Sequence, residues 1–277
     1  MNIPSAGRVP PPAPRPLPPE HGLQKVGHGI QKAALIVVHK IESVVTTILS
    51  AFPLVLLTPL NLTRYEPKKK TDCDPKETPI LLIHGFLGSS SNLIYHWYRL
   101  RKAGHKNVFC INLGDPRKSI EEYAEKVAKK VERIQELTGR KDLVLVGHSM
   151  GGLVAEQYRS IAPKDTQVKK IITLGTPILG TVVAHLAAFW SKSAKEMLPN
   201  SPFLQRLKKF VEADQTTQYY HVGAKADLIV PPLASALGGE TKYKSTHVIQ
   251  ARGHIGILYS RTTGDFVVND VAEKGPA

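Results

Sequence analysis

The chain has 277 residues, which is enough for one α/β domain of roughly 200 residues and an extension. Its hydrophobic (42%) and charged (22%) contents are those of a globular protein with a substantial core. The net charge of +14 is spread along the chain: residues 1–78 carry ten Lys and Arg against six Asp and Glu, and the rest carry 27 against 17. This charge favours an anionic surface such as acidic lipid headgroups, and a merely solvated basic surface is an equal alternative. No nucleic-acid-binding motif accompanies it, so we expect no nucleic acid partner.

The first 28 residues form a tail rich in proline. Eight of the 21 prolines fall within residues 1–19, and so many prolines exclude a helix or a central strand there. We predict a disordered or polyproline-like tail, with a docking peptide for a proline-reading domain as the alternative. A secretory signal is a poor match, because the first apolar stretch lies too far from Met1.

Residues 29–63 are the hydrophobic part of the extension. Apolar residues recur at helical spacing through residues 29–52, and Ser43–Thr63 is a run of 21 residues without a charge. One interpretation is a transmembrane or re-entrant segment, although Pro53 and Pro59 interrupt a straight span. The other is an amphipathic helix in the membrane interface or packed on the following domain.

We favour a membrane-associating segment over a soluble packing helix. Basic residues flank both of its ends, so the side of the membrane is not determined, and a cytoplasmic location is the alternative. The polar residues 64–78 predict a linker to the domain that follows. The oligomeric state is left open.

Residues 79–277 alternate short apolar strands with helices, which predicts an α/β domain. The expected strands are 80–83, 108–113, 143–146, 170–174, 218–222 and 246–250. Residues 119–138 predict an amphipathic helix that begins with Ser119 and Glu122 at capping-box spacing and stops at Gly139. Such alternation predicts a mostly parallel sheet with helices on both faces and a site at the carboxyl ends of its strands. The two cysteines, Cys73 and Cys110, suggest neither a disulfide framework nor a metal site.

The sequence around Ser149 predicts a nucleophile. An apolar strand ends abruptly in Gly147-His148-Ser149-Met150-Gly151, and a helix-compatible stretch follows at once. This G-x-S-x-G pattern lies between a strand and a helix, the context in which it predicts a sharp turn that exposes a serine hydroxyl. The two glycines are needed because side chains at those positions would collide across the turn.

A serine nucleophile needs a histidine to take its proton and a carboxylate to orient that histidine. Asp227 follows a predicted strand, where a loop could aim it inward, and Asp165, Asp214 and Glu240 are its rivals. Among eleven histidines, His254 follows the last strand and has glycines on both sides. We therefore predict a triad in the chain order serine, acid, histidine, formed by Ser149, Asp227 and His254.

Two backbone amides are candidates for an oxyanion hole. One is that of Met150, at the start of the helix after the nucleophile. The other is that of Phe86, in the loop His84-Gly85-Phe86-Leu87-Gly88 after the first strand.

An amphipathic insertion at about residues 181–213 interrupts the alternation. We predict a lid over an apolar acyl pocket, with pocket or lid residues Leu87, Leu186, Phe189 and Trp190. A pair of ordinary covering helices is the alternative, because the same apolar positions would serve a core.

Together these motifs resemble the lipase and esterase branch of the α/β-hydrolase superfamily, in particular bacterial triacylglycerol-lipase-type enzymes and, more distantly, GPI inositol-deacylases. The resemblance covers about residues 78–260 and includes Gly175-Thr176-Pro177. It implies an α/β-hydrolase fold and hydrolysis of carboxylic esters, especially lipid acyl esters, through an acyl-serine without a cofactor. Some lipases of this type bind structural Ca²⁺ or Zn²⁺, but no ligand cluster here supports a metal. A thioesterase, an amidase, an acyltransferase and a membrane-tethered interaction protein without activity are the alternatives.

Overall fold

Six parallel strands form the sheet on which the described part of the chain is built. The computed structural model describes residues 61–231, 243–249 and 253–272. The strands are β1 (Ile80–Ile83), β2 (Val108–Ile111), β3 (Asp142–His148), β4 (Gln167–Leu174), β5 (Gln218–Ala224) and β6 (Tyr243–Ile249), in the order β2-β1-β3-β4-β5-β6. All five neighbouring pairs are parallel, which confirms the predicted sheet.

The register of the sheet brings the ends of its central strands together. Ile83 at the end of β1 pairs with Gly147 of β3, His148 pairs with Leu174 at the end of β4, and Leu174 pairs with Val222 of β5. The loops after β1, β3, β4 and β5 therefore leave the sheet at one edge, where sites of parallel α/β sheets lie.

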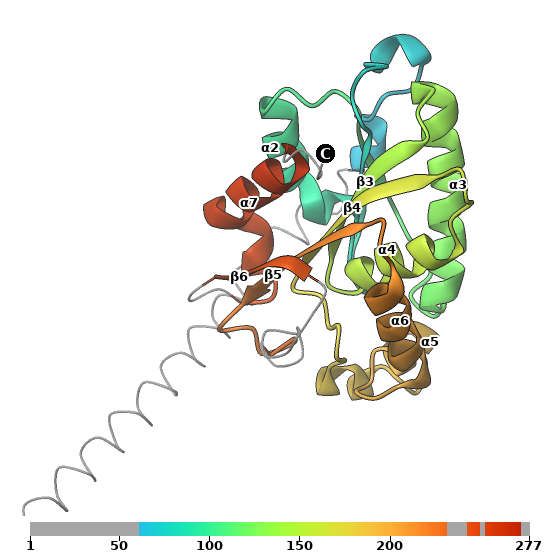
Figure 1. Ribbon diagram of the computed structural model, residues 1–277. Helices are drawn as coiled ribbons and strands as arrows, with labels where there is room; N and C mark the ends of the chain where they lie inside the picture. Colours follow the sequence, from blue (N-terminus) through green and yellow to red (C-terminus); the bar gives the residue numbers. More distant parts are fainter. Residues whose placement is uncertain (1–60, 232–242, 250–252, 273–277) are drawn as a thin grey trace, which may run out of the picture. The chain divides into compact units, whose positions relative to one another are not determined.

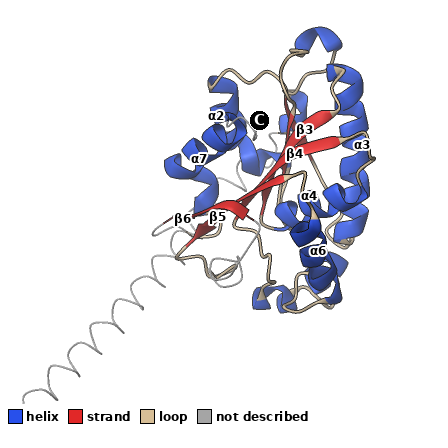
Figure 2. Cartoon of the chain, viewed as in Figure 1, coloured by secondary structure: helices blue, strands red, loops and turns tan. Residues whose placement is uncertain are grey.

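Helices cover both faces of the sheet (Figures 1 and 2). The helices on one face are α2 (Ile94–Lys102) and α7 (Arg261–Ala272), and those on the other are α3 (Ile120–Thr138), α4 (Met150–Ile161) and α6 (Pro202–Ala213). Side chains of a strand alternate between its faces. Accordingly, Ile80 and Leu82 belong to a hydrophobic cluster that includes α2 and α7, and Leu81 and Ile83 belong to the cluster with α3, α4 and α6.

Helix α3 shows how local sequence sets an element. The Ser119 side chain accepts a hydrogen bond from the Glu122 N–H, and the Glu122 carboxylate accepts one from the Ser119 N–H. Gly139 then ends the helix in the left-handed conformation, at φ 71°. The predicted capping box and glycine stop are confirmed.

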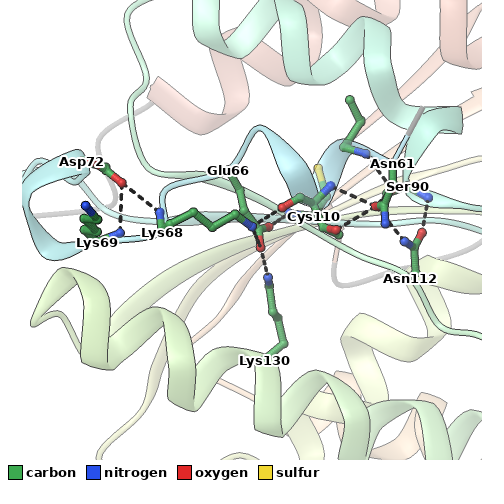
Figure 3. Close-up of polar contacts among 11 residues, drawn as sticks. Asn61, Glu66, Lys68, Lys69, Asp72, Ser90, Cys110, Asn112 and Lys130 are labelled. Carbon is green, nitrogen blue, oxygen red and sulfur yellow. Dashed lines mark hydrogen bonds and ion pairs between the residues drawn. The ribbon is translucent and has the colours of Figure 1, made fainter. Parts of the chain in front are cut away.

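The segment predicted as a linker is packed against the edge of the sheet (Figure 3). The 3₁₀ helix η1 (Leu62–Arg64) leads into it from the end of the predicted hydrophobic segment, and the 3₁₀ helix η2 (Lys70–Asp72) lies within it. The buried Glu66 carboxylate accepts the Cys110 N–H of β2 at 3.1 Å and pairs with Lys130 Nζ of α3 at 2.5 Å. The Asn61 side-chain oxygen accepts hydrogen bonds from Ser90 Oγ and Asn112 Nδ2. Composition suggested a linker because the partners of Glu66 in β2 and α3 are far from it in the sequence.

The predicted membrane-associating segment lies largely outside the described residues. The Pro-rich tail and residues 29–60 are not described, whereas Leu62, near the end of the predicted segment, is buried against the domain. Among the helices of residues 61–231, 243–249 and 253–272, none has the length and apolar character needed to cross a bilayer.

The predicted lid, residues 181–213, divides into two parts. The first contains η4 (Val182–Leu186) and α5 (Lys192–Glu196), and the second is α6. Phe203, Leu204, Leu207 and Val211 of α6 are buried in the core cluster that includes α4. Residues 202–213 are therefore packed as a covering helix of the core, the alternative that the sequence left open. The apolar spacing that predicted a lid serves packing there.

Candidate active site

Ser149 lies in a sharp turn between β3 and α4, as the motif predicts. Its backbone has φ 53° and ψ −125°, a conformation that non-glycine residues seldom adopt. A Cβ on Gly147 would collide with the backbone of Gly151, so the turn requires glycine there. The turn is braced by the Thr176 hydroxyl, which donates to the Ser149 carbonyl at 2.9 Å.

The structure brings Ser149, His254 and Asp227 into one chain of hydrogen bonds. Ser149 Oγ lies 2.9 Å from His254 Nε2, and His254 Nδ1 lies 2.7 Å from Asp227 Oδ2. All three side chains are less than 10% exposed. A carboxylate oxygen only accepts, so Nδ1 carries a proton and Nε2 is free to accept the serine proton.

Asp227 has the placement that an orienting carboxylate needs. Its second oxygen, Oδ1, accepts the N–H groups of Ile229 and Val230 at 2.9 and 2.8 Å. The carboxylate is thus held by backbone on one side and by His254 on the other. Of its rivals, Asp214 pairs with Arg159, Asp165 pairs with Lys141 on the surface, and Glu240 lies outside the described residues.

The two predicted oxyanion donors are both near the nucleophile: Met150 follows Ser149 in the chain, and the loop that carries Phe86 lies against Ser149 in space. Met150 is the first residue of α4, so its N–H is among those that a helix leaves without an internal partner. Phe86 follows Gly85, and a Cβ added to Gly85 would lie only 2.9 Å from the Ser149 Cβ. Glycine therefore lets the loop after β1 approach the serine.

Two further histidines border this arrangement, and the sequence analysis gave neither a role. His84 Nδ1 lies 2.8 Å from the Gly85 carbonyl, and its Nε2 accepts the Leu113 N–H at 2.9 Å. His148 Nε2 lies 3.2 Å from the His254 carbonyl. Burial lowers the pKa of His84 to about 4 and the pKa of His148 well below its ordinary value. The only signal in the sequence was the presence of a histidine directly beside each of two motif positions.

A cavity of about 650 Å³ opens at Ser149 and is lined mainly by apolar side chains. Leu87, Leu186 and Trp190, three of the four predicted pocket or lid residues, line it. Phe189 does not line it and is 85% exposed. The prediction placed it on one helical face with Leu186, but η4 ends at Leu186 and a turn follows, so the spacing no longer keeps the two on one side.

Comparison with known families agrees with this fold. The family model described as the alpha/beta hydrolase fold matches residues 78–219, just over half of the chain. The protein therefore belongs to the α/β-hydrolase family.

Curated relatives and solved structures include proteins that this chain resembles in sequence or in fold. A triacylglycerol lipase of Pseudarthrobacter phenanthrenivorans and one of Burkholderia plantarii are each 27% identical over 113 residues, or 38% of this chain. The alignment spans only 35% and 31% of those relatives, about a third of their length. The crystal structure of the mature Bacillus licheniformis lipase covers 72% of this chain and 94% of that one, with a TM-score of 0.59 and 19% identity. The chain thus shares its fold with this lipase and, over about a third of their length, resembles the two triacylglycerol lipases in sequence.

Proposed function

We propose that the protein is a serine hydrolase that cleaves carboxylic esters, with lipid acyl esters as its substrates. The observation that carries this proposal is the unbroken hydrogen-bond chain from Ser149 Oγ through His254 to Asp227. The Thr176 hydroxyl holds the Ser149 carbonyl, and two backbone N–H groups hold the Asp227 carboxylate. The arrangement is therefore fixed before a substrate arrives.

In this mechanism His254 Nε2 takes the Ser149 proton while Oγ forms a bond to the ester carbonyl carbon. The negative charge moves to the carbonyl oxygen, which the Phe86 and Met150 N–H groups stabilise. The carbon–oxygen bond to the alcohol then breaks, and His254 returns its proton to the leaving oxygen. Water attacks the acyl-serine with His254 again as the base, and the acid product leaves with Ser149 restored.

The cavity supports a substrate with an apolar acyl group. Its lining includes Met197, Val230 and Leu258 together with the predicted residues Leu87, Leu186 and Trp190. Ser149 and His254 belong to the same lining, so a hydrocarbon chain would gain from burial among the apolar side chains while the ester lies at the serine.

We also propose that the enzyme draws its substrate from a lipid surface. Several large apolar side chains in the segments that line the cavity are exposed: Leu87, Leu179, Val182, Leu186, Phe189, Trp190 and Leu228. Exposed apolar side chains gathered around a pocket are typical of a membrane or protein contact surface. The charge-free run in residues 43–63 supports the same partner.

The test is hydrolysis of nitrophenyl esters of increasing acyl length by wild type and Ser149→Ala, with and without detergent micelles. We expect activity that rises with chain length and micelles and that falls at least about 10³-fold in the variant. Equal activity of the two proteins would contradict the mechanism. Hydrolysis of acyl thioesters or amides but not esters would favour the corresponding alternative enzymes.

A separate experiment tests the lipid surface. Deleting residues 1–60 retains Asn61 and Leu62, which pack on the domain. We expect this shortened protein to leave the membrane fraction while its hydrolysis of a short soluble ester persists. Unchanged membrane recovery would contradict a role for the N-terminal segment.

A further inference from the structure

We propose that His84 and His148 are a pair of positioning residues, each a neutral imidazole that fixes one backbone group of the active site. His84 holds the peptide that carries the Phe86 N–H, and His148 holds the main chain of His254. This inference rests on the proposed function, because it assigns the two histidines to the same reaction.

The hydrogen bonds of His84 determine its protonation. A carbonyl only accepts, so the 2.8 Å contact with the Gly85 oxygen places a proton on Nδ1. The Leu113 N–H donates to Nε2 at 2.9 Å, so Nε2 has a lone pair. Only the neutral ring with its proton on Nδ1 makes both bonds. The side chain is 3% exposed, and burial favours this neutral form.

Fixing the Gly85 carbonyl also fixes the Phe86 amide. The two groups belong to one planar peptide, and no peptide bond in the described residues is cis, so they point in opposite directions. The Gly88 N–H donates to the same carbonyl at 3.1 Å. With the carbonyl held on the His84 side, the Phe86 N–H is directed away from it, and Gly85 lies against Ser149.

His148 acts on the other half of the site. Its Nε2 lies 3.2 Å from the His254 carbonyl and therefore carries the proton, the opposite tautomer from His84. His148 and Ser149 are neighbours at the end of β3, so one strand holds His254 at two points, its main chain and its Nε2. The β3 strand pairs with β1 on one side and β4 on the other, which makes it a rigid support.

The neutrality of His148 matters during the reaction. Its ring centroid lies 4.9 Å from that of His254, which becomes a cation when it takes the serine proton. A second cation at this distance would oppose that step. Complete burial, with added repulsion from His254, His96 and His84, keeps the pKa of His148 far below its ordinary value and prevents such a second charge.

The opposite tautomers allow a sharp test with amide side chains. An Asn amide nitrogen lies near the position of histidine Nδ1, and a Gln amide nitrogen lies near that of Nε2. We expect His84→Asn and His148→Gln to retain kcat within about tenfold, because each keeps its donor. His84→Gln and His148→Asn misplace the donor and should lower kcat by about 10²-fold, with KM nearly unchanged.

The assay uses the full chain, a nitrophenyl ester, and a fluorophosphonate probe that counts reactive serines, so that unfolded protein does not enter kcat. His105→Gln, at a partly buried histidine that pairs with Glu77 outside the cavity, is the control, with activity equal to wild type.

Two outcomes are distinguishable. If wild type neither reacts with the probe nor cleaves esters, the proposed function fails, and this inference fails with it. If wild type is active but Asn and Gln are equivalent at both positions, donor placement is irrelevant and the positioning roles are overturned while the proposed function stands.

Discussion

The two parts of the insertion after β4 have similar apolar composition, but the most exposed apolar side chains lie in the first part and the largest buried ones in the second. In the first part, Leu186 and Phe189 are 77% and 85% exposed, near the mouth of the cavity. In α6, Leu207 and Phe203 are each 4% exposed and contribute to the core. Sequence pattern alone assigned both parts to one lid. The comparison shows that apolar spacing in a sequence predicts a face that favours burial. It does not tell whether that face packs on another helix or meets a substrate surface.

The backbone explains why the two parts differ. Helix α6 begins with Ser201, whose side chain accepts the Leu204 N–H, and continues for 12 residues, long enough to present a full apolar stripe to α4. The η4 helix has five residues and cannot present such a stripe. Its largest exposed apolar side chains, Val182 and Leu186, therefore remain at the surface beside the cavity.

Acid should have the largest effect on stability, because it must protonate histidines that are as buried as the core face of α6. Burial lowers the pKa of His84 to about 4 and that of His96 to about 3, against an ordinary value of 6.5. Between these limits the unfolded chain binds more protons than the folded one, so stability is full above about pH 6.5 and is lost as the pH falls through the folded values. We expect a loss of roughly 3 kcal/mol from His84 and roughly 5 kcal/mol from His96 once the pH is below both folded values, measured by urea unfolding.

Replacement of His96 isolates one contribution to this acid sensitivity. Neither ring nitrogen of His96 has a partner among the described residues, and the side chain is fully buried. His96→Leu should therefore reduce, by about one, the number of protons that the protein takes up on unfolding in acid, and so flatten the dependence of the free energy of unfolding on pH. His185→Gln, on exposed η4, is the matched control and should leave the curve unchanged. A His96→Leu curve as steep as wild type would refute the assignment.

A matched pair of leucines tests the comparison directly. Leu207→Ala removes buried side-chain volume from the core and should lower the free energy of unfolding by about 3 kcal/mol. Leu186→Ala removes the same atoms from an exposed position and should change it by less than about 0.5 kcal/mol. Chemical denaturation of both variants gives the two values. Equal losses would mean that η4 is packed in solution as α6 is.

The smallest expected effect concerns lipid binding by the exposed part. The double variant Leu186→Ser and Phe189→Ser should bind phosphatidylcholine vesicles several-fold more weakly, because less apolar area enters the lipid. Its hydrolysis of a short soluble ester should stay within about twofold of wild type at saturating substrate. Vesicle co-sedimentation measures the binding. If the double variant binds vesicles as wild type does, Leu186 and Phe189 are not part of the lipid contact surface.

Much of the fold and the three central site residues could be predicted because their signals are local. The capping box of Ser119 and Glu122, the strand-turn-helix pattern around Ser149, and the glycines beside His254 each lie within a few neighbouring residues. Parallel pairing then brings distant strand ends to one edge without further information.

The contacts that sequence reasoning missed depend on distant partners. Glu66 meets Lys130 across 64 positions, and His148 meets His254 across 106. No periodicity marks such pairs. A polar residue in a short loop has the same local signature whether it faces water or accepts a buried amide. The helix α6 and the exposed η4 segment could not be separated for the same reason.

The contact between Glu66 and the Cys110 amide has a consequence for self-association. Strand β2 is at the end of the order of the described strands, so its outer backbone groups have no strand beside them. Such an edge is a template for pairing with another molecule, and a charged side chain bound across it blocks that pairing. A protein begun at Pro79, where composition places the domain boundary, would keep every residue of the triad and lose this cover. We expect this shortened protein to aggregate through the exposed edge of β2 although its active-site residues are all present.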